Sequence, residues 1–218
     1  MEFGLFIDYG PALLSGFGMT VLCWIIGTVG GAALGLLIAL AQRYGNHLLR
    51  GLLQVYIEII RGTPFLVQLF LLYYGGPHFG LRLGSLEAGL VGLIVYGSPY
   101  FAEIFRAGFL SVPLGQVEAA RAMGFSEATI VRRIMIPILL VSTLPALTNF
   151  AIILTKETVI LSVVTVPELL YQVQTMSAET FAFVEATFAV AMFFWIFVEA
   201  IAHLGRVLEK RVTHYLLK

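Results

Sequence analysis

The chain has 218 residues, of which 59% are apolar and only 12% are charged, and its formal net charge is zero. Together with a mean hydropathy of +0.93, this composition excludes a water-soluble domain. The sequence therefore predicts an all-α integral membrane protein, built as a single domain over residues 1–218.

Five apolar stretches are long enough to cross a bilayer as helices, which takes roughly 20 residues. An odd number of spans places the two termini on opposite sides of the membrane. Cytoplasmic ends are enriched in Lys and Arg, and with the N-terminus outside, every Lys and Arg except Arg82 and Lys156 falls at or near the inner face. We therefore expect a cytoplasmic C-terminus. The stretches are the uncharged run between Asp8 and Arg43 and the segments near 62–81, 86–105, 134–155 and 182–204.

Small residues recur at every fourth position of the first span, at Gly27, Gly31, Gly35 and Ala39. This spacing places them in one row on a helix face, where another helix can approach closely. The partner is a helix of the same chain or of a second copy, and we favour the same chain. The single cysteine, Cys23, lies in this span and is expected to be a small packing residue, so no disulfide forms within the chain. The four histidines lack ligand partners at suitable spacing, so no metal site is expected.

Two segments carry Glu and Arg three residues apart, Glu58 with Arg61 and Glu103 with Arg106. Residues at this spacing share a helix face and can pair. The first pair is expected to open the second span and the other to close the third. Mutual neutralisation at the cytoplasmic rim explains both pairs, and a gating role is the alternative.

Prolines interrupt the second and third spans. Pro64 must bend or break its helix because it has no backbone N–H, and Gln68 follows about one turn later. Pro99 and Ser98 introduce a kink and a hydroxyl into the third span. Breaks at membrane depth are tolerated where they face protein or a water-filled cavity. We interpret Gln68 and Ser98 as candidate lining of a translocation path, and a packing kink is the alternative.

The fourth span adds further polar residues. Asn149 and Phe150 lie in its interior, and Lys156 and Glu157 follow near its outer end. Ionisable groups within a membrane segment are functional candidates, although these two could simply mark the end of the helix. Asn149, Phe150 and Lys156 complete the candidate substrate path.

The loop of about residues 109–137 contains a polar helix-turn-helix pattern. The chain is expected to turn at Pro113 and Gly115, and residues 118–123 then form a short helix with Glu118 at its positive end. Gly124 can take the left-handed conformation that ends a helix. Ser126 is a plausible cap for the next helix, which Pro137 is expected to bound. We predict a short cytoplasmic helix that is exposed for docking.

The pattern Glu118-Ala119-Ala120, three residues, Gly124, nine residues, Ile134-Met135-Ile136-Pro137 resembles the signature loop of permease subunits of ATP-binding-cassette importers. The chain is similar, more narrowly, to the permeases for histidine, glutamine, arginine and opines. The resemblance runs from about Pro11 to the C-terminus. The segments that carry it are Tyr56 to Gln68, Tyr100 to Gly108, and Val112 to Gln116.

The resemblance implies a type I importer fold in a bacterial cytoplasmic membrane, working as a homodimer or beside a similar second permease. It further implies an external substrate-binding protein and an ATPase subunit whose groove receives the short helix. No Gly-x4-Gly-Lys-Ser/Thr motif occurs in the sequence, so the chain is not itself an enzyme, and ATP and Mg²⁺ are expected on the ATPase. No cofactor or nucleic acid is expected. The coupling residues would be Glu118, Ala119, Ala120, Arg121, Met123 and Gly124.

The expected function is ATP-driven import of a polar amino acid by alternating access. Many relatives carry an acidic or amide residue after the asparagine of the fourth span, where this chain has Phe150. If that position contacts substrate, a neutral or aromatic amino acid fits better than a cationic one. The alternatives are an importer of another small solute and a secondary transporter without an ATPase. A membrane enzyme would need a nucleophile with its base, a metal cluster or clustered carboxylates, and none is found in the sequence.

Overall fold

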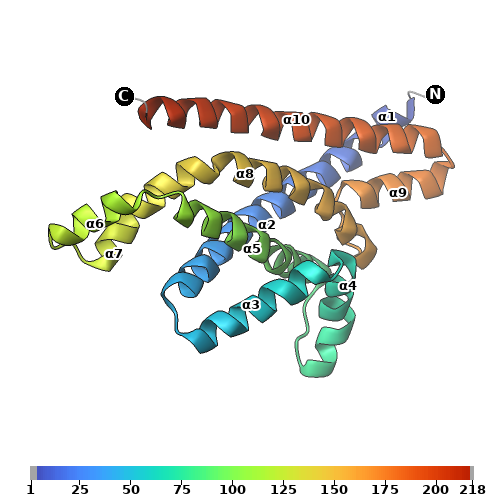
Figure 1. Cartoon of the computed structure of the whole chain (residues 1–218). Coiled ribbons are helices and arrows are strands. Elements are labelled where there is room, and N and C mark those ends of the chain that lie inside the picture. Colours follow the sequence, from blue (N-terminus) through green and yellow to red (C-terminus); the bar gives the residue numbers. More distant parts are fainter. Residues whose placement is uncertain (1–3, 217–218) are drawn as a thin grey trace.

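The computed structural model describes residues 4–216, and their regular elements are helices throughout, which confirms the all-α prediction. Figure 1 shows how the helices follow one another along the chain. They are α1 (Gly4–Asp8), α2 (Gly10–Tyr44), α3 (His47–Gly62), α4 (Phe65–Phe70), the π-helical η1 (Leu71–Gly75), the 3₁₀-helical η2 (Gly76–Phe79), α5 (Ser85–Leu110), α6 (Leu114–Ala122), α7 (Glu127–Ile130), the π-helical η3 (Val131–Met135), α8 (Ile136–Glu157), the 3₁₀-helical η4 (Thr158–Val164), α9 (Leu169–Thr180) and α10 (Phe183–Leu216).

Within the described residues, four helical stretches are long and apolar enough to cross a membrane. A fifth span forms if two helices that meet at a sharp bend count as one: His47–Gly62 and Phe65–Phe79 meet at 107°. The predicted five spans are therefore found if the bent pair counts as one span, and four are found if it does not. The unbroken stretches are Gly10–Tyr44, Ser85–Leu110, Glu127–Val164 and Phe183–Val212.

The bend at Pro64 corrects the predicted start of the second span. Residues 58–62 form the end of α3, whereas they were predicted to form the beginning of the second span. Pro64 adopts an extended conformation, with φ −64° and ψ 141°, and begins α4 as its N-cap. Because proline cannot donate to the preceding turn, α3 ends and the chain changes direction.

Close packing between α2 and α5 forms the centre of the fold. A Cβ atom added to Gly27 would lie 2.9 Å from Leu93 Cβ, and one added to Gly35 would lie 2.7 Å from the Ser98 carbonyl oxygen. Gly31 faces the Phe101 ring in the same way. The predicted row of small residues therefore packs within the chain, as favoured, and lets the two backbones approach. Cys23 is fully buried in this core, as expected.

The fourth span is continuous through Pro137. This corrects the prediction that Pro137 marks a helix boundary. The helix begins at Glu127, passes through η3 and continues as α8 to Glu157. The wider π-helical turn just before Pro137 accommodates the missing N–H and the ring, so the helix does not end there. Pro145 also lies inside α8. The span is accordingly longer than the predicted segment of 134–155.

A helix that the sequence did not predict, α9, is anchored to α2 by a buried carboxylate. Glu168 is fully buried and accepts hydrogen bonds from the Tyr171 backbone N–H at 2.9 Å and from the Thr20 hydroxyl at 3.3 Å. The Leu169 N–H donates to the same Thr20 oxygen at 3.0 Å. Glu168 lies between two candidate spans, and its burial raises the pKa of its carboxyl to about 7 against the opposing effect of these hydrogen bonds.

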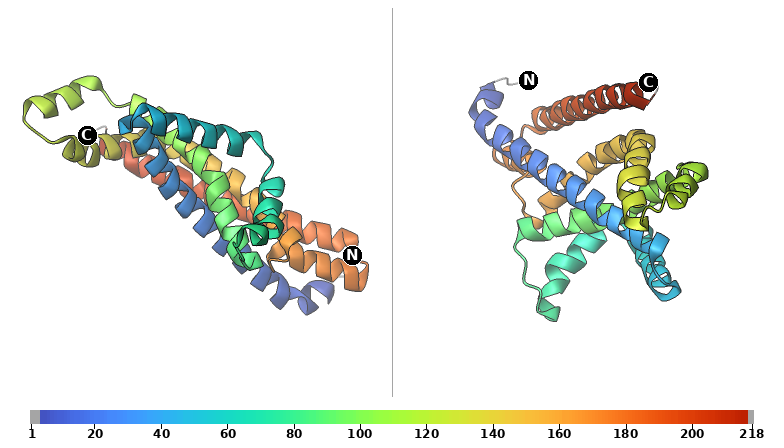
Figure 2. Two further views of the ribbon diagram at one scale, coloured as in Figure 1. Left: turned by 90° about the horizontal axis from the view of Figure 1, so that it is seen from below. Right: turned by 90° about the vertical axis from the view of Figure 1, so that its left-hand side faces the viewer.

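The arrangement places the two termini at opposite ends of the helical array (Figure 1). The C-terminal end of α10 lies toward the same end as α6 and α7, and the N-terminal end of α2 lies at the other. Figure 2, in its left-hand view, shows α6 and α7 projecting beyond the other helices. This projection makes α6 and its flanking turns accessible from outside the helical array.

Candidate functional site

The projecting loop contains α6 and α7 joined by a tight turn. Helix α6 begins at Leu114, directly after Pro113 as its N-cap, so Gly115 lies inside the helix and not at a turn. Glu118 consequently lies in the middle of α6, and the expectation that it occupies the positive end of the helix is wrong. Helix α6 begins earlier in the sequence than expected. Pro113 directly precedes it in an extended conformation, with ψ at 125°, and a proline is tolerated there because the first turn of a helix does not need its N–H.

The turn after α6 follows the predicted local chemistry. Gly124 has a positive φ of 80°, which glycine adopts without strain. The Phe125 N–H donates to the Ala120 carbonyl at 3.1 Å, which satisfies an end-of-helix acceptor. Ser126 caps α7 by accepting a hydrogen bond from the Thr129 N–H at 3.3 Å, as predicted.

An ion pair fixes α6 against the beginning of the fourth span. Arg121 donates to both carboxylate oxygens of Glu127, at 2.5 and 3.1 Å. The hydrogen bond with Glu127 raises the pKa of the Arg121 guanidinium. Both side chains are about half exposed, so the pair contributes orientation more than stability.

The predicted coupling residues divide by burial. Ala120 packs inside the loop with Val117, while Glu118, Ala119, Arg121, Met123 and Gly124 are exposed. Large apolar side chains lie beside them: Leu114 is 73% exposed and Met123 is 68% exposed. A projecting surface that combines apolar side chains with charged ones is typical of a docking site.

A second feature is a cavity of about 420 Å³ between α3 and α5, which we call the mixed-charge cavity. Its charged lining consists of Glu58, Arg61 and Glu103, and Tyr100 and Gln54 add polar groups. Arg61 lies over the Tyr100 ring at 5.4 Å, and Gln54 donates to Glu58 at 2.8 Å. The predicted Glu58–Arg61 pair is therefore not formed, because each partner finds a different neighbour.

The other predicted ion pair is present at the edge of this cavity. Arg106 donates to Glu103, with 2.8 Å between Nη2 and Oε2. Glu103 lines the mixed-charge cavity, whereas Arg106 does not. The cavity thus contains one guanidinium and two carboxylates within a largely apolar chain.

Tyr100 connects the cavity to the fourth span. Its ring stacks on Phe150, with centroids 4.9 Å apart and planes at 20°. Phe150 also meets Phe101 edge-on at 4.8 Å. Of the predicted path residues, Phe150 is the one that reaches a lining residue of the mixed-charge cavity, although it is itself buried.

The structure places the remaining predicted path residues in separate positions. Gln68 lines a mostly apolar cavity of about 440 Å³ near the Pro64 bend. The Ser98 hydroxyl is buried and lies 2.7 Å from the Tyr56 hydroxyl. Asn149 and Lys156 are exposed. Together with Phe150, the predicted path residues therefore do not line one common cavity within the chain.

Gln68 has a clear structural role at the bend. Its amide nitrogen donates to the Ile60 carbonyl at 2.8 Å and to the Thr63 carbonyl at 3.0 Å. These are end-of-helix acceptors of α3 that the proline leaves without a donor. The side chain thus completes the hydrogen bonding of the broken span.

The sequence had indicated Glu58, Arg61 and Glu103 only as ion-pair members, and it had not indicated Tyr100 as a lining residue. The sequence does show Gln54, Glu58 and Arg61 at helical spacing on one face of α3. That this face meets Tyr100 and Glu103 of α5 is visible only in the fold. Which side chains meet depends on how α3 packs after the turn at Gly45 and Asn46. Among the side chains that the structure describes, residues 4–212, no group of three or more His, Cys, Asp or Glu could hold a metal ion.

Comparisons with known proteins agree along almost the whole chain. It is 34% identical over 211 residues to the probable amino-acid ABC transporter permease protein YckA of Bacillus subtilis (strain 168), covering 97% of this chain and 93% of that protein. It is 35% identical over 204 residues to the glutamine transport system permease protein GlnP of Escherichia coli (strain K12), covering 93% of each.

Solved structures show the same architecture. A crystal structure of an amino acid ABC transporter with histidines matches with a TM-score of 0.87 at 34% identity, covering 97% of this chain and 99% of that one. An inward-facing structure of the MetNI methionine ABC transporter matches with a TM-score of 0.73 at 22% identity, over the same shares, and supports the fold alone. A family model for the binding-protein-dependent transport system inner membrane component matches residues 31–214, and the chain belongs to this family of ABC importer permeases.

Proposed function

We propose that the chain is the permease subunit that carries a polar amino acid across a bacterial cytoplasmic membrane in an ATP-driven importer. The observation that carries the cargo assignment is the mixed-charge cavity beside Tyr100. The relatives support it, since they include a probable amino-acid permease and a glutamine permease.

The chemistry of the cavity suits a zwitterion. An amino acid presents an ammonium and a carboxylate a few bonds apart, and Glu58 and Glu103 offer acceptors for the first while Arg61 offers donors for the second. Hydrogen bonds between charged groups are stronger than those between neutral groups. An ion of one sign would leave either the lining carboxylates or the lining guanidinium without a partner. The site therefore favours a molecule that carries both a positive and a negative group.

The aromatic wall indicates the kind of side chain that is carried. Phe150 stacks on Tyr100 behind the cavity, at the position where many relatives carry an acidic or amide residue, so no carboxylate stands there to pair with a cationic side chain. A neutral or aromatic amino acid is therefore the proposed cargo. Gln68, Ser98, Asn149 and Lys156 remain candidate path residues, for contacts made in another conformation or with a second permease.

The proposed orientation has the N-terminus outside and the C-terminus in the cytoplasm. The distribution of Lys and Arg supports it, and so does the position of α6 and α7 at the end where α10 finishes (Figure 1). Helix α6 would then face the cytoplasm as the coupling helix, with Glu118, Ala119, Arg121, Met123 and Gly124 presented to an ATPase.

The proposed assembly follows from the family. ATP and Mg²⁺ would be held by two ATPase subunits, an external binding protein would deliver the amino acid, and a second permease would complete the path as a copy or a paralogue of this chain. Closure of the ATPases would move the coupling helices and switch access between the two sides, driven by their different affinity for the two states.

The test begins with purification of the tagged full-length chain in mild detergent, with every co-eluting subunit identified. The complex is reconstituted in liposomes, and uptake of labelled amino acids is measured with and without ATP. The proposal predicts a co-eluting ATPase and ATP-dependent uptake. Uptake by the chain alone without ATP would instead establish a secondary transporter.

A pair of variants distinguishes the role of this cavity from the general effect of removing a positive charge. Arg61→Gln is expected to raise the KM for the amino acid by about tenfold or more, because one charge-assisted hydrogen bond is lost. Arg82→Gln is the matched control, since Arg82 is exposed and lies outside the mixed-charge cavity. Equal KM values in the two variants would contradict the role of this cavity.

A further inference from the structure

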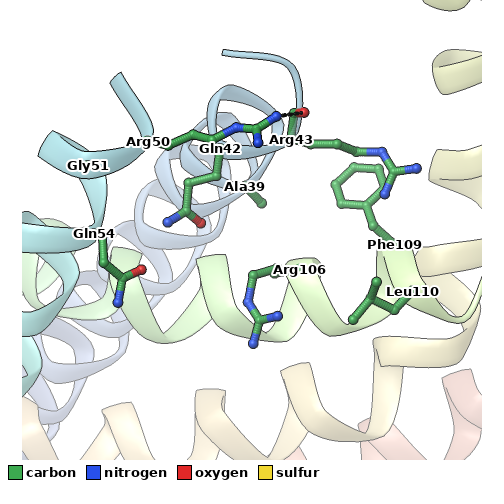
Figure 3. Close-up of a pocket in the computed structure, with 9 residues that line it drawn as sticks. All are labelled: Ala39, Gln42, Arg43, Arg50, Gly51, Gln54, Arg106, Phe109 and Leu110. Atoms are coloured by element: carbon green, nitrogen blue, oxygen red, sulfur yellow. Dashed lines mark hydrogen bonds between the residues drawn. The ribbon is translucent and has the colours of Figure 1, made fainter. Parts of the chain in front are cut away.

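A second charged cavity lies between the ends of α2 and α5 and the beginning of α3 (Figure 3). Its volume is about 490 Å³, and we call it the arginine cavity. Arg43 is in the last turns of one candidate span and Arg106 in the last turns of another. The cavity is therefore at the level of a membrane surface, where apolar tails and polar headgroups meet.

Three arginines from three helices line this cavity: Arg43 from α2, Arg50 from α3 and Arg106 from α5. No carboxylate is among the lining residues, although Glu103 pairs with Arg106 from outside the cavity. Arg43 and Arg50 therefore supply a positive charge that no acidic lining residue offsets. Guanidinium groups bind phosphate through paired hydrogen bonds, which makes phosphate the best-matched anion.

Neighbouring groups hold two of these side chains in place. The Arg43 guanidinium lies over the Phe109 ring at 5.3 Å. Arg50 donates through Nη2 to the Arg43 carbonyl at 2.9 Å, as drawn in Figure 3. Both side chains have thus already lost part of their conformational freedom. Binding an anion through their remaining N–H donors therefore costs less entropy.

The rest of the lining indicates an amphiphile with a hydroxylated headgroup. The carbonyl oxygen of the Gln42 side chain is buried and has no hydrogen-bond partner. It can accept from a hydroxyl, which an inorganic ion such as sulfate lacks. Ala39, Phe109 and Leu110 form apolar walls beside it, and these suit the glycerol backbone and the first methylenes of a lipid tail.

We propose that the arginine cavity binds an anionic phospholipid whose headgroup carries a hydroxyl, such as phosphatidylglycerol. Arg43 and Arg50 hold the phosphate, and Gln42 accepts a hydrogen bond from the headgroup hydroxyl. Basic pockets between membrane helices are a general means of holding acidic lipids. The proposal does not depend on which solute the protein transports.

The experiment measures ligand-induced thermal stabilisation of the full-length chain, purified in a nonionic detergent with the subunits that co-elute. Three probes are compared: phosphatidylglycerol, phosphatidylcholine with the same acyl chains, and inorganic phosphate. Phosphatidylglycerol is expected to raise the unfolding temperature at lower concentration than the other two. Arg50→Gln should raise its half-maximal concentration by about tenfold or more, and R43Q/R50Q should abolish its advantage over phosphatidylcholine.

The variants include their own controls. Arg50 is exposed, so Arg50→Gln should fold, and its unfolding temperature without lipid checks this. Arg132→Gln removes an exposed arginine that does not line the cavity and should keep the preference for phosphatidylglycerol.

Four results would overturn the proposal. Equal stabilisation by the two lipids would show that the protein does not recognise the anionic headgroup. An unchanged preference in R43Q/R50Q, or its equal loss in Arg132→Gln, would remove the arginine cavity as the site. Stabilisation by inorganic phosphate at the same concentration would show that the ligand is free phosphate.

Discussion

The close approach of α2 and α5 gives the most direct prediction for stability, through the substitution Gly35→Ala. The new Cβ atom would lie 2.6 Å from Phe101 Cβ, 2.7 Å from the Ser98 carbonyl oxygen and 2.8 Å from the Ala102 nitrogen, where ordinary contacts begin at 3.4 Å. Two of these atoms belong to the α5 backbone and cannot rotate away. The helices must therefore separate by several tenths of an ångström along their main contact.

The energy follows from two opposing effects. Overpacking a close-packed interior destabilises by about 1–3 kcal/mol, while replacing glycine by alanine inside a helix stabilises by about 1 kcal/mol. Gly35→Ala should therefore lower the free energy of unfolding by up to about 2 kcal/mol. Gly18→Ala, on the same helix, meets no atom within 4 Å and should keep only the favourable effect.

Thermal unfolding of both variants in the same detergent tests the reasoning, with a change of about 2–4 °C expected for each kcal/mol in a chain of this size. The two substitutions should shift the unfolding temperature in opposite directions. Shifts of the same sign and size would show that the approach of α2 to α5 is looser than the structure indicates.

Three other predictions concern the loop, the bend and the buried carboxylate. Gly124→Val should uncouple ATP hydrolysis from uptake, because φ is 80° there; Gly80→Val, at φ 82° outside the loop, should cause similar strain without uncoupling, and normal uptake in Gly124→Val would contradict a coupling role. Gln68→Leu should destabilise by about 1–3 kcal/mol, since the carbonyls of Ile60 and Thr63 lose their donor, and an unchanged unfolding temperature would refute this. Burial raises the pKa of the Glu168 carboxyl in the folded chain from 4.5 to about 7, so the free energy of unfolding should fall by about 3 kcal/mol as pH rises from 4.5 to 7 and level off at higher pH. Glu168→Gln should remove this dependence, and an equal slope in the variant would assign it to other groups.

Features that depend on a few consecutive residues were predicted well from the sequence. The turn after α6 was predicted because Gly124 and Ser126 act on their immediate neighbours, through a positive φ and a side-chain cap. The long apolar spans were predicted for a similar reason, since length and composition suffice. The row containing Gly35 identified a packing face, and the structure then supplied α5 as the partner.

Prolines were the main source of error in the fold. Both Pro64 and Pro137 lack an N–H, yet one bends the chain by 107° and the other lies within a continuous helix. The difference is in the surrounding turns: a π-helical segment precedes Pro137, while an extended Thr63 precedes Pro64. Neither conformation can be deduced from the residue itself, because the packing of neighbouring helices decides between them.

The candidate site depends on tertiary contacts to a still greater degree. Spacing showed that Glu58 and Arg61 could pair, but α5 places the Tyr100 ring under Arg61 and Gln54 bonds to Glu58. Phe150 was identified because it stands where many relatives carry an acidic or amide residue. Its stacking on Tyr100 could be seen only in the folded structure. Sequence reasoning therefore found candidate residues on each helix but not the cavity that they form together.

The continuity of the fourth span suggests how the loop and the cavity are connected under the proposed function. Residues 127–164 form one helical stretch, so no flexible loop separates Glu127 at its start from Phe150 in its interior. Arg121 ties α6 to Glu127, and Phe150 contacts Tyr100 at the mixed-charge cavity. A displacement of α6 by a docked ATPase is thus expected to move α8 and shift the Phe150 ring against Tyr100. The π-helical turn before Pro137 keeps the helix continuous at that proline, and this mechanical connection depends on it.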